Sequence, residues 1–556
     1  MRQDVREDVL RHLKADFRFK ERGPWLQQGV CPKCAKREVF ASAETPWTVK
    51  CGRENKCGWS ATTKDLYPDA FGQFNERFPS TTQDPDATAD AYMDFVRGFP
   101  PSKIKGWYRQ GHFSHPRGDR TTATVVFDLD RENGIWMERL IETVRVTDND
   151  GTVTERKANF VGRHKGLWWS PPGLTIQPGD ELWIVEGCLD AIALKLNGVK
   201  AVANLSCSNY PALRLDALGT RDITLVWALD NDPAGRAATR KHIAKAHEGG
   251  FECPAALIPQ KGREKWDWND CHLSGALTGK DLDRYRFHGD LFTASSAAEK
   301  GLLIWQRYGS RAFAVKYNTR TYWWELPDEQ YATVLSALES DPGMNPDPDI
   351  PNEVAAAKKT AKVSTVANCD IEFLYFQQNK LTDESWYYTR IQFPHGRHVI
   401  KNTFNGAQVA AAAEFKKRLL SIAPGALFSG NTSQLNWLVS HYLDEIKIVE
   451  TVPFVGYSKE QKAWVFNDLA VSGGKAYELN DEDFFEVGNL SIKSLNQSLQ
   501  LTIGDRESYQ PDWVNHLYTA FGARGLIALV WFFGSLFAEQ IREMHKSFPF
   551  LEIVGE

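Results

Sequence analysis

The sequence lacks an apolar segment long enough to cross a membrane. Its longest apolar stretch, residues 526–538, contains a glycine and is shorter than the about 20 residues that a transmembrane helix needs. We therefore expect a buried core helix there. The sequence also lacks an amino-terminal signal peptide, which predicts a cytoplasmic location and argues against disulfide bonds.

A strong charge of one sign is also absent. The 556 residues carry a formal net charge of −5, with 25% charged and 42% hydrophobic residues. These proportions are those of an ordinary globular protein, and the length predicts three or four domains. Residues 1–65 differ, because they hold 14 Lys and Arg residues against 9 Asp and Glu residues. This local excess of basic residues is consistent with contact with a nucleic-acid phosphate backbone. It is equally consistent with a small domain that is merely soluble.

Short apolar runs alternate with helical patterns in the second quarter of the chain. The runs are residues 182–185, 199–205, 223–229 and 254–258, and the helical patterns are residues 189–196 and 234–246. Continuous apolar runs of this length, separated by helices, predict buried parallel strands in an α/β sheet. Ligands bind such sheets at the carboxyl ends of the strands.

Acidic residues lie at the ends of two of these runs. Glu186 and Gly187 follow the first run, and Asp230 and Asp232 follow the third. Carboxylates brought close together repel one another unless a cation neutralises them, and their hard oxygens favour Mg²⁺ or Mn²⁺. We expect Asp230 and Asp232 to be metal ligands, and Glu186 to be a third ligand or a proton acceptor.

Three more acids extend the predicted metal site. Asp190 lies four residues after Glu186 on the same face of the following helix. Asp267 and Asp270 follow the last apolar run. These three acids are expected to hold a second ion or the water shell of either ion. Asp267 or Asp270 can instead cap the next helix.

The ordered set Glu-Gly-x-x-Asp, Asp-x-Asp-Pro-Ala-Gly and Asp-x-Asn-Asp resembles the Toprim domain, which DnaG-type primases, topoisomerases and some nucleases share. The resemblance covers roughly residues 180–275. It implies a parallel α/β sheet with a carboxylate site for metal-dependent chemistry on phosphates. The alternative is an unrelated Rossmann-like domain.

Four of the nine cysteines form two close pairs near the amino end. Cys31 and Cys34 are the first pair, and Cys51 and Cys57 are the second. Four thiolates at a hairpin-length spacing suit a structural, tetrahedral Zn²⁺. The alternatives are four unrelated buried thiols or two disulfides. The remaining cysteines stand singly and are expected to be inert: Cys188, Cys207, Cys253, Cys271 and Cys369.

Residues 55–59 and 64–67 look like the zinc ribbon of phage and plasmid DnaG-type primases. A zinc ribbon upstream of a Toprim domain in one chain indicates a primase. The resemblance implies synthesis of short RNA primers on a single-stranded DNA template from ribonucleoside triphosphates, with the ribbon reading the template. It also implies a replicative helicase as partner, in cis or in trans, and an oligomer formed through a helicase ring.

Residues 110–179 contain alternating runs with hairpin signals at residues 132–134 and 148–151, which predict a β-rich subdomain. In the family that it resembles, this subdomain carries residues that hold nucleotide and nascent primer. A segment of Lys, Ala and Asn at residues 157–159 resembles the family's Lys-x-x-Asn segment but is one residue shorter. The alternative is a set of solvated charges on a strand face. The candidates here are Arg139, Arg145, Lys157, Asn159, Arg163 and Lys165.

The fold class predicted from these patterns is multidomain α/β and α+β. We predict a zinc ribbon, a β-rich subdomain beside a Toprim sheet, and a carboxyl-terminal α+β domain. In the last part, strands are expected at residues 365–375 and 386–393, and helices at 407–422 and 434–443. A hairpin joins residues 313–317 to 321–326. The predicted segments are 1–66, 67–109 (linker and short helices), 110–179, 180–285, 286–350 (hairpin unit and linker) and 351–556.

The sequence contains no phosphate-binding loop of the Gly-x-x-x-x-Gly-Lys-Ser/Thr type. Residues 551–556 read as an apolar strand that ends at a glycine, as many strands before such loops do. One hypothesis is that the chain stops just before a helicase motor, in a primase-helicase of a phage or other mobile element acting in the bacterial host cytoplasm. The alternative is a natural carboxyl terminus.

Two other functions fit parts of the pattern. The Toprim acids of a nuclease or strand-passage enzyme cleave phosphodiesters with the same carboxylate chemistry, although Toprim nucleases usually lack this upstream ribbon. A helicase-loading or origin-binding scaffold with a degenerate site is the non-enzymatic alternative. The presence of Glu186, Asp230 and Asp232 argues against the scaffold.

Overall fold

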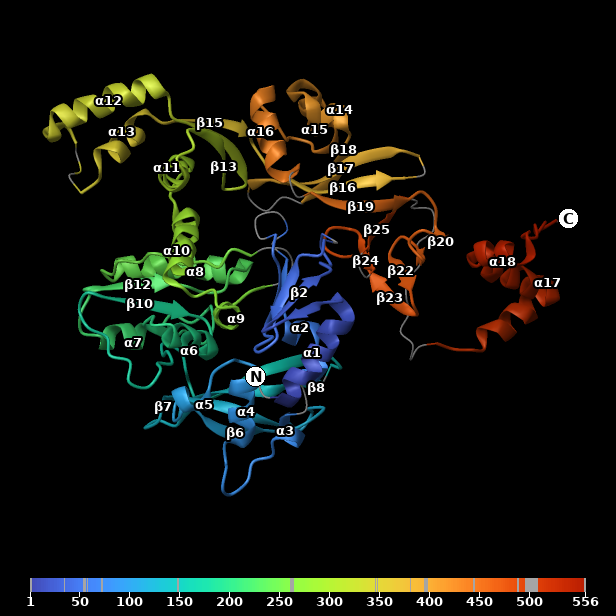
Figure 1. Cartoon of the computed structure of the whole chain (residues 1–556), viewed down its shortest axis with the longest axis horizontal. Helices are drawn as coiled ribbons and strands as arrows, with labels where there is room; N and C mark the ends of the chain where they lie inside the picture. Colours follow the sequence, from blue (N-terminus) through green and yellow to red (C-terminus); the bar gives the residue numbers. More distant parts are fainter. Residues whose placement is uncertain are drawn as a thin grey trace. The chain divides into compact units, whose positions relative to one another are not determined.

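The computed structural model describes residues 3–554 except 35, 54–56, 58, 72–73, 148–149, 261–264, 346, 348, 381, 395–398, 444–445, 488–489 and 496–508. The chain forms two compact units, Met1–Arg307 and Tyr308–Glu556. Figure 1 shows the first unit in blue to green and the second in yellow to red. The candidate site lies in the first unit.

The first unit begins with helix α1 (Gln3–Phe17) and a five-stranded antiparallel sheet in the order β1-β2-β3-β4-β5. Its strands are β1 (Lys20–Arg22), β2 (Trp25–Gly29), β3 (Val39–Ser42), β4 (Thr48–Cys51) and β5 (Ser60–Thr62). The chain then forms short helices: α2 (Thr63–Leu66), η1 (Pro68–Phe71), α3 (Phe74–Arg77), α4 (Ala87–Phe95) and α5 (Pro101–Ile104).

A four-stranded antiparallel sheet follows, in the order β6-β7-β8-β9. Its strands are β6 (Arg109–Phe113), β7 (Thr122–Asp130), β8 (Ile135–Thr147) and β9 (Val153–Val161). Both predicted hairpins are confirmed, because β7 pairs with β8 and β8 pairs with β9. The second turn includes residues 148 and 149, which lie outside the described residues.

The parallel sheet has the order β11-β10-β12, with β10 (Asp180–Val185) between β11 (Ala201–Ala203) and β12 (Ile223–Trp227). Residues 182–185 are all buried, as expected for a strand covered on both faces. Helices α6 (Cys188–Leu196) and α8 (Pro233–Glu248) confirm the two helical patterns, and α7 (Ala212–Ala217) was not predicted. The expected fourth strand at 254–258 does not form as a regular strand, because this run makes a single isolated parallel bridge, from Ala255 to Trp227 of β12.

Two apolar clusters cover the faces of this sheet. One includes Trp183, Val185 and Val226 and continues to residues of α1 and the amino-terminal sheet. The other includes Ile184 and Trp227. Successive side chains of a strand point to opposite faces, so the sheet has a core on each side. Helices α9 (Trp268–Leu273), α10 (Gly279–Thr293) and α11 (Ala297–Tyr308) complete the unit.

The described residues of the second unit form three sheets. The first has the order β13-β14-β15, and its β13 and β14 form the predicted hairpin. The second is six-stranded, in the order β18-β17-β16-β19-β25-β24, and the third has the order β20-β21-β22-β23. The strands are β13 (Ala312–Tyr317), β14 (Arg320–Glu325), β15 (Lys362–Ala367), β16 (Asp370–Asn379), β17 (Glu384–Gln392), β18 (Ile400–Phe404), β19 (Lys447–Val452), β20 (Gly456–Ser458), β21 (Ala463–Val465), β22 (Leu469–Ser472), β23 (Lys475–Glu478), β24 (Phe485–Val487) and β25 (Leu490–Ser494).

Helices accompany these sheets. They are α12 (Asp328–Ser340), η2 (Pro342–Met344), α13 (Asn352–Thr360), α14 (Gly406–Ala410), α15 (Ala412–Ile422), α16 (Thr432–Leu443), α17 (Trp513–Leu536) and α18 (Ala538–His545). The predicted strand 365–375 is two strands in different sheets, β15 and β16. The predicted helix 407–422 breaks at Ala411, whose backbone is extended.

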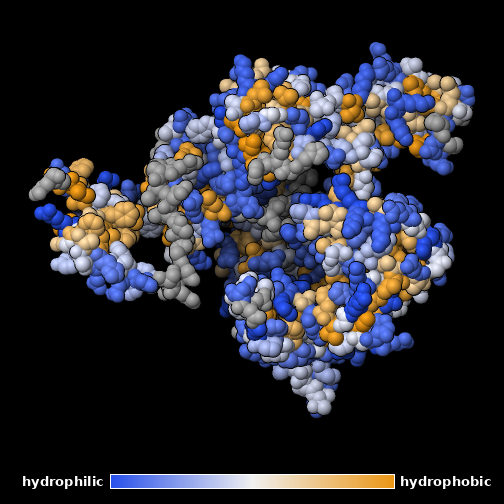
Figure 2. All heavy atoms as spheres, turned by 180° about the vertical axis from the view of Figure 1, so that it is seen from behind, coloured by the Kyte–Doolittle hydropathy of each residue, from blue (hydrophilic) through white to orange (hydrophobic). Residues whose placement is uncertain are grey.

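The expectation of a buried core helix near residue 530 is wrong. No residue of α17 is buried, and Figure 2 shows hydrophobic side chains on the surface of the carboxyl-terminal part. Among the described residues, α17 alone is long and apolar enough to cross a membrane, judged by length and composition only. However, Gly522 has φ 60° and ψ −153° and interrupts it. The helical part after this kink is about 21 Å long, whereas a bilayer core is about 30 Å thick.

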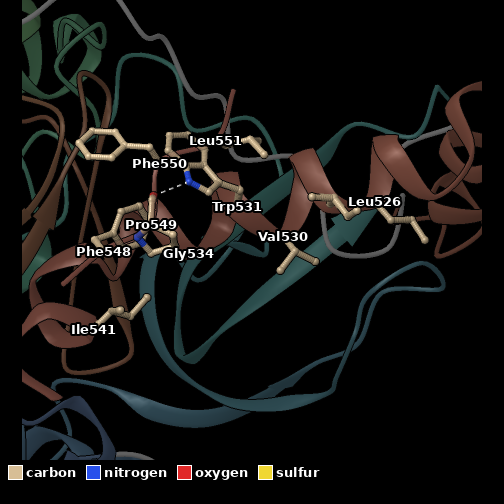
Figure 3. A pocket seen from close by; sticks show the side chains of 10 residues that line it. Leu526, Val530, Trp531, Gly534, Ile541, Phe548, Pro549, Phe550 and Leu551 are labelled. Carbon is tan, nitrogen blue, oxygen red and sulfur yellow. Dashed lines mark hydrogen bonds between the residues drawn. The ribbon is translucent and has the colours of Figure 1, made fainter. Parts of the chain in front are cut away.

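The apolar surface of α17 continues into α18. An apolar groove of about 550 Å³ lies among residues of α17, α18 and the chain after them. Figure 3 shows Trp531 beside Phe548 and Pro549 in this groove, and the Trp531 indole N–H donates to the Pro549 carbonyl at 2.9 Å. Residues 551–554 form no strand, contrary to the prediction, and residues 555 and 556 lie outside the described residues.

Candidate active site

The acidic edge, which we define as Glu186, Asp190, Asp230, Asp232, Asp267 and Asp270, lies at the carboxyl end of the parallel sheet. Strands β10 and β12 are hydrogen-bonded neighbours, and Ile184 pairs with Trp227. Glu186 directly follows β10 and Asp230 follows shortly after β12. Parallel pairing therefore brings these two carboxylates to one edge, as the sequence predicts.

The carboxylates of Glu186 and Asp230 are held in surroundings that oppose their charges. Burial raises the pKa of Glu186, and the charge of Asp232 adds to this effect, against a hydrogen bond from the backbone of Cys207. Burial raises the pKa of Asp230 to about 7, and the nearby charges of Glu186 and Asp267 contribute. A hard divalent cation would relieve this repulsion, and the oxygen donors present fit such an ion.

Asp232 has a second, local role at the start of a helix. It is the N-cap of α8, and its Oδ1 accepts from the Gly235 N–H at 2.8 Å. This hydrogen bond is the main cause that lowers the pKa of Asp232. Its other oxygen, Oδ2, lies 3.4 Å from Lys265 Nζ. A Cβ atom on Gly235 would stand 2.0 Å from the Asp230 carbonyl oxygen, so only glycine fits this position in the first turn of α8.

Asp190 links two parts of the edge. Its side chain is only 7% exposed. Its Oδ2 accepts from the Gly187 N–H and its Oδ1 accepts from the Asn269 N–H, both at 3.2 Å. Burial raises the pKa of Asp190, and the charge of Asp267 raises it further. With both oxygens bonded to backbone amides, Asp190 ties the turn after β10 to the first turn of α9.

Asp267 and Asp270 cap helix α9 reciprocally. The Asp270 N–H donates to Asp267 Oδ1 at 2.8 Å, and the Asp267 N–H donates to Asp270 Oδ2 at 3.1 Å. This capping box matches the alternative that the sequence left open for these residues. Burial raises the pKa of Asp270 to about 7, and the charge of Asp267 contributes. One oxygen of each carboxyl group remains outside the cap, so metal binding by either residue stays a prediction.

Four cysteines converge in the amino-terminal sheet. The Sγ atoms of Cys31 and Cys57 are 3.7 Å apart, and those of Cys34 and Cys51 are 3.9 Å apart. Four sulfurs about 2.3 Å from a tetrahedral Zn²⁺ would be separated by about 3.8 Å, whereas a disulfide needs about 2.05 Å. All four Sγ atoms lie within 4.8 Å of one another. The geometry indicates a zinc site and excludes the disulfide alternative.

The two predicted metal sites differ in compactness. Within the described part of the chain, the four cysteines are the one group of three or more side chains whose ligand atoms all lie this close together. The carboxylates of the acidic edge share a region but form no group of that kind. Residues 55, 56 and 58 of the ribbon-like segment lie outside the described residues.

The predicted nucleotide-binding residues are spread along β8, β9 and the following loop. Arg145 forms an ion pair with Glu155 at 3.4 Å near the turn between β8 and β9. This position lies about 20 Å along β8 from Arg139. Asn159 donates to Glu138 Oε2 at 2.8 Å. Lys157, Arg163 and Lys165 are exposed. The structure does not gather these residues into one cluster, and their role stays a prediction.

Several residues beside the edge escaped the sequence analysis. Arg97 donates to the Asn269 Oδ1 at 3.1 Å, and it also donates to the Tyr92 hydroxyl at 3.0 and 2.8 Å. Lys265 forms the ion pair with Asp232. Asn269 stands inside the Asp-x-Asn-Asp motif, which was the available signal for it. Arg97 and Tyr92 belong to a segment that reads as a linker and offers no signal.

The Toprim-like family matches residues 183–272. This segment is therefore similar to that family, and we call it the Toprim-like domain. It contains all six residues of the acidic edge, and its limits agree with the predicted resemblance over residues 180–275. The predicted fold class, with a zinc ribbon before a Toprim sheet and mixed α/β structure, is confirmed.

Solved primase structures are similar to parts of the chain. The zinc-binding and RNA polymerase domains of the Aquifex aeolicus primase align with 56% of this chain and 98% of that one, at 15% identity and a TM-score of 0.24. A DnaG catalytic core aligns with 37% of this chain and 73% of that one, at 18% identity and a TM-score of 0.26. The RNA polymerase domain of Mycobacterium tuberculosis DnaG aligns with 41% of this chain and 77% of that one, at 22% identity and a TM-score of 0.24. No curated protein matches the chain.

Proposed function

We propose that the protein is a DNA primase that synthesises short RNA primers on single-stranded DNA. The observation that carries this proposal is the combination, within one compact unit, of a four-cysteine cluster and a Toprim-like domain. The cluster supports a template-reading ribbon, and the acidic edge supports metal-dependent nucleotidyl transfer. Neither feature alone separates a primase from a nuclease.

In the proposed reaction, the 3′-hydroxyl of one nucleotide attacks the α-phosphate of the next and pyrophosphate leaves. Asp230 and Asp232 would hold Mg²⁺ or Mn²⁺, with Glu186 beside them. The ion, when bound, lowers the pKa of the attacking hydroxyl and neutralises charge that develops on the phosphate. Glu186 is suited to accept the hydroxyl proton, because burial raises its pKa. Positioning of the two nucleotides supplies much of the rest.

The basic residues complete the proposed site. Guanidinium and ammonium groups bind phosphates well, and Lys157, Arg163 and Lys165 are exposed to solvent. We assign Arg139, Arg145 and Asn159 to the same task of holding nucleotide and primer. A helicase that exposes single-stranded template, in cis or in trans, belongs to the same proposal, as does action in the cytoplasm of a bacterial host. Stimulation of priming on duplex DNA by a replicative helicase would support it.

The decisive experiment is incubation with single-stranded DNA, Mg²⁺ and labelled ribonucleotides. Short RNA products support the primase, DNA fragments indicate a nuclease instead, and the absence of both favours a scaffold. The matched variant is Asp232→Asn, because asparagine keeps the N-cap of α8 about as well as aspartate while it removes the charge. We expect this variant to fold and to lose primer synthesis. A yield near that of the unmodified protein at saturating Mg²⁺ would exclude Asp232 from the site.

A further inference from the structure

A buried arginine lies behind the acidic edge. Arg97 follows helix α4 and is only 6% exposed. Its Nη1 donates to Asn269 Oδ1 at 3.1 Å, and the Asn269 Nδ2 donates back to the Arg97 carbonyl at 2.9 Å. Asn269 is itself fully buried. This reciprocal pair of hydrogen bonds, which we call the Arg97–Asn269 clamp, joins residues that are 172 positions apart in the chain.

The clamp is connected to the predicted metal ligands by hydrogen bonds. The Asn269 N–H donates to Asp190 Oδ1, and Asp190 Oδ2 accepts from the Gly187 N–H, both at 3.2 Å. Gly187 directly follows Glu186. Asn269 also stands between Asp267 and Asp270, which cap α9. A shift of Asn269 would therefore move both the helix that carries Asp270 and the turn that carries Glu186.

The surroundings of Arg97 stabilise its positive charge. The Tyr92 hydroxyl accepts its other donors, so the buried guanidinium is hydrogen-bonded on two sides. Burial acts to lower the pKa of Arg97, but the nearby Tyr92 and Asp267 outweigh burial and raise it. Lys64 of helix α2 faces the same place, because the charge of Arg97 lowers the Lys64 pKa. A buried cation bonded in this way holds its partners rigidly, since breaking the pair leaves a charge uncompensated.

We propose that Arg97 is a positioning residue for divalent-cation binding, acting through the Arg97–Asn269 clamp on the acidic edge. Among the residues that the structure describes, Arg97 donates hydrogen bonds to Tyr92 and Asn269 and not to Glu186, Asp230 or Asp232, so its effect is indirect. The inference rests on the metal-binding part of the proposed function. Partners that orient metal ligands in this way typically change metal affinity by about 10- to 100-fold when they are lost.

The test is direct titration of Mn²⁺ into the full chain, read by the spin resonance of free Mn²⁺. Zinc is kept bound at the cysteines, and both the Kd and the number of sites are fitted. The main variant is Arg97→Lys, which keeps the positive charge and loses the planar, multiply bonded guanidinium. We expect its Kd for Mn²⁺ to weaken by about tenfold or more at an unchanged number of sites. Arg117→Met, at an exposed arginine of the same unit, is the matched control and should leave the Kd unchanged.

Three further variants separate position from charge and from folding. Asn269→Ser should weaken Mn²⁺ binding as Arg97→Lys does, and the double variant should be no weaker than either single one, because both changes break one clamp. Arg97→Met removes a cation beside the carboxylates. If charge were the only role of Arg97, this variant would bind Mn²⁺ more tightly, and that result would overturn the proposal.

Other results would overturn it as well. An unchanged Kd in Arg97→Lys, with or without a reduced number of sites, would mean that Arg97 only stabilises the fold. A wild-type protein that binds no Mn²⁺ would also refute the clamp's role. Primer synthesis is measured in parallel on the same samples. Wild-type protein that binds Mn²⁺ but makes no RNA would refute the primase and leave the clamp standing, so the two failures are distinguishable.

Discussion

At the scale of single residues, Glu186 and Asp232 have opposite electrostatic surroundings. Burial raises the pKa of Glu186, whereas the Gly235 N–H lowers the pKa of Asp232. Asp232 therefore keeps its charge most readily and suits a permanent ligand. Glu186 takes up a proton more readily, which suits a group that accepts one during the reaction. The two predicted ligands thus differ in the role that each fits best.

This difference predicts the effect of Glu186→Gln, which keeps the size of the side chain and removes its charge. We expect primer synthesis to fall by about 10²- to 10⁴-fold, the range for one positioned acid or base group. The melting temperature of the metal-free protein should rise, because one charge leaves a crowded acidic edge. Rates of primer extension and thermal unfolding measure the two effects. Glu132→Gln, at an exposed hairpin residue, is the control, and a loss below tenfold would assign Glu186 a structural role.

The sequence was sufficient to predict that Glu186, Asp230 and Asp232 lie at one edge of the sheet, because each follows a strongly apolar run. A strand end is a local pattern, and parallel pairing then places the acids together without further information. The Arg97–Asn269 clamp could not be found in this way. It joins residues 172 positions apart, and buried polar pairs of this kind depend on packing that no local pattern encodes.

At the scale of secondary-structure elements, the amino-terminal sheet depends on its cysteines to bring two loops together. Cys31 and Cys34 follow β2, Cys51 ends β4, and Cys57 precedes β5. The strands are only three to five residues long, and so short a sheet has little core of its own. Zinc binding would therefore supply part of its folding free energy.

Cys57→Ser should accordingly release the zinc and unfold the amino-terminal sheet. The parallel sheet has a separate apolar cluster around Ile184 and Trp227, so the Toprim-like domain should survive. We expect the variant to lose template-directed initiation and to retain some extension of a supplied RNA primer. Metal analysis and hydrogen exchange measure the structural effect, and Cys369→Ser, at a single buried cysteine of the second unit, is the control. Equal loss of initiation and extension would contradict an independent catalytic core.

Helices and strands with a strong hydrophobic pattern can be predicted from the sequence. Helices and strands whose ends depend on contacts with distant residues cannot. The apolar run at 254–258 makes a single isolated bridge to β12, although its composition fits a strand. The sequence predicts one strand at residues 365–375, because nothing local shows that β15 and β16 join different sheets. The apolar stretch of α17 predicts a core helix that the structure does not show, since apolarity alone does not distinguish a buried helix from an exposed one.

At the scale of the whole molecule, the chain divides into two compact units after Arg307. The predicted boundary at 285 falls inside α10, which packs closely on the run at 254–258. The Leu257 N–H donates to the Tyr285 carbonyl at 2.9 Å, and a Cβ on Gly289 would stand 2.0 Å from the Ala255 carbonyl oxygen. Helix α10 thus packs against the run that follows β12, a contact that the sequence did not reveal.

Two truncated proteins test this division. A fragment of residues 1–309 keeps all of α11 and ends at Gly309, whose φ of 70° suits the end of a helix. We expect it to fold, to bind one zinc and to make primers. A fragment that ends at residue 285 loses Phe287, which is buried, and should be less stable by at least about 3 kcal/mol. Urea unfolding and primer synthesis compare the two fragments. Equal stability would restore the boundary at 285, and a stable but inactive fragment 1–309 would show that the second unit takes part in priming.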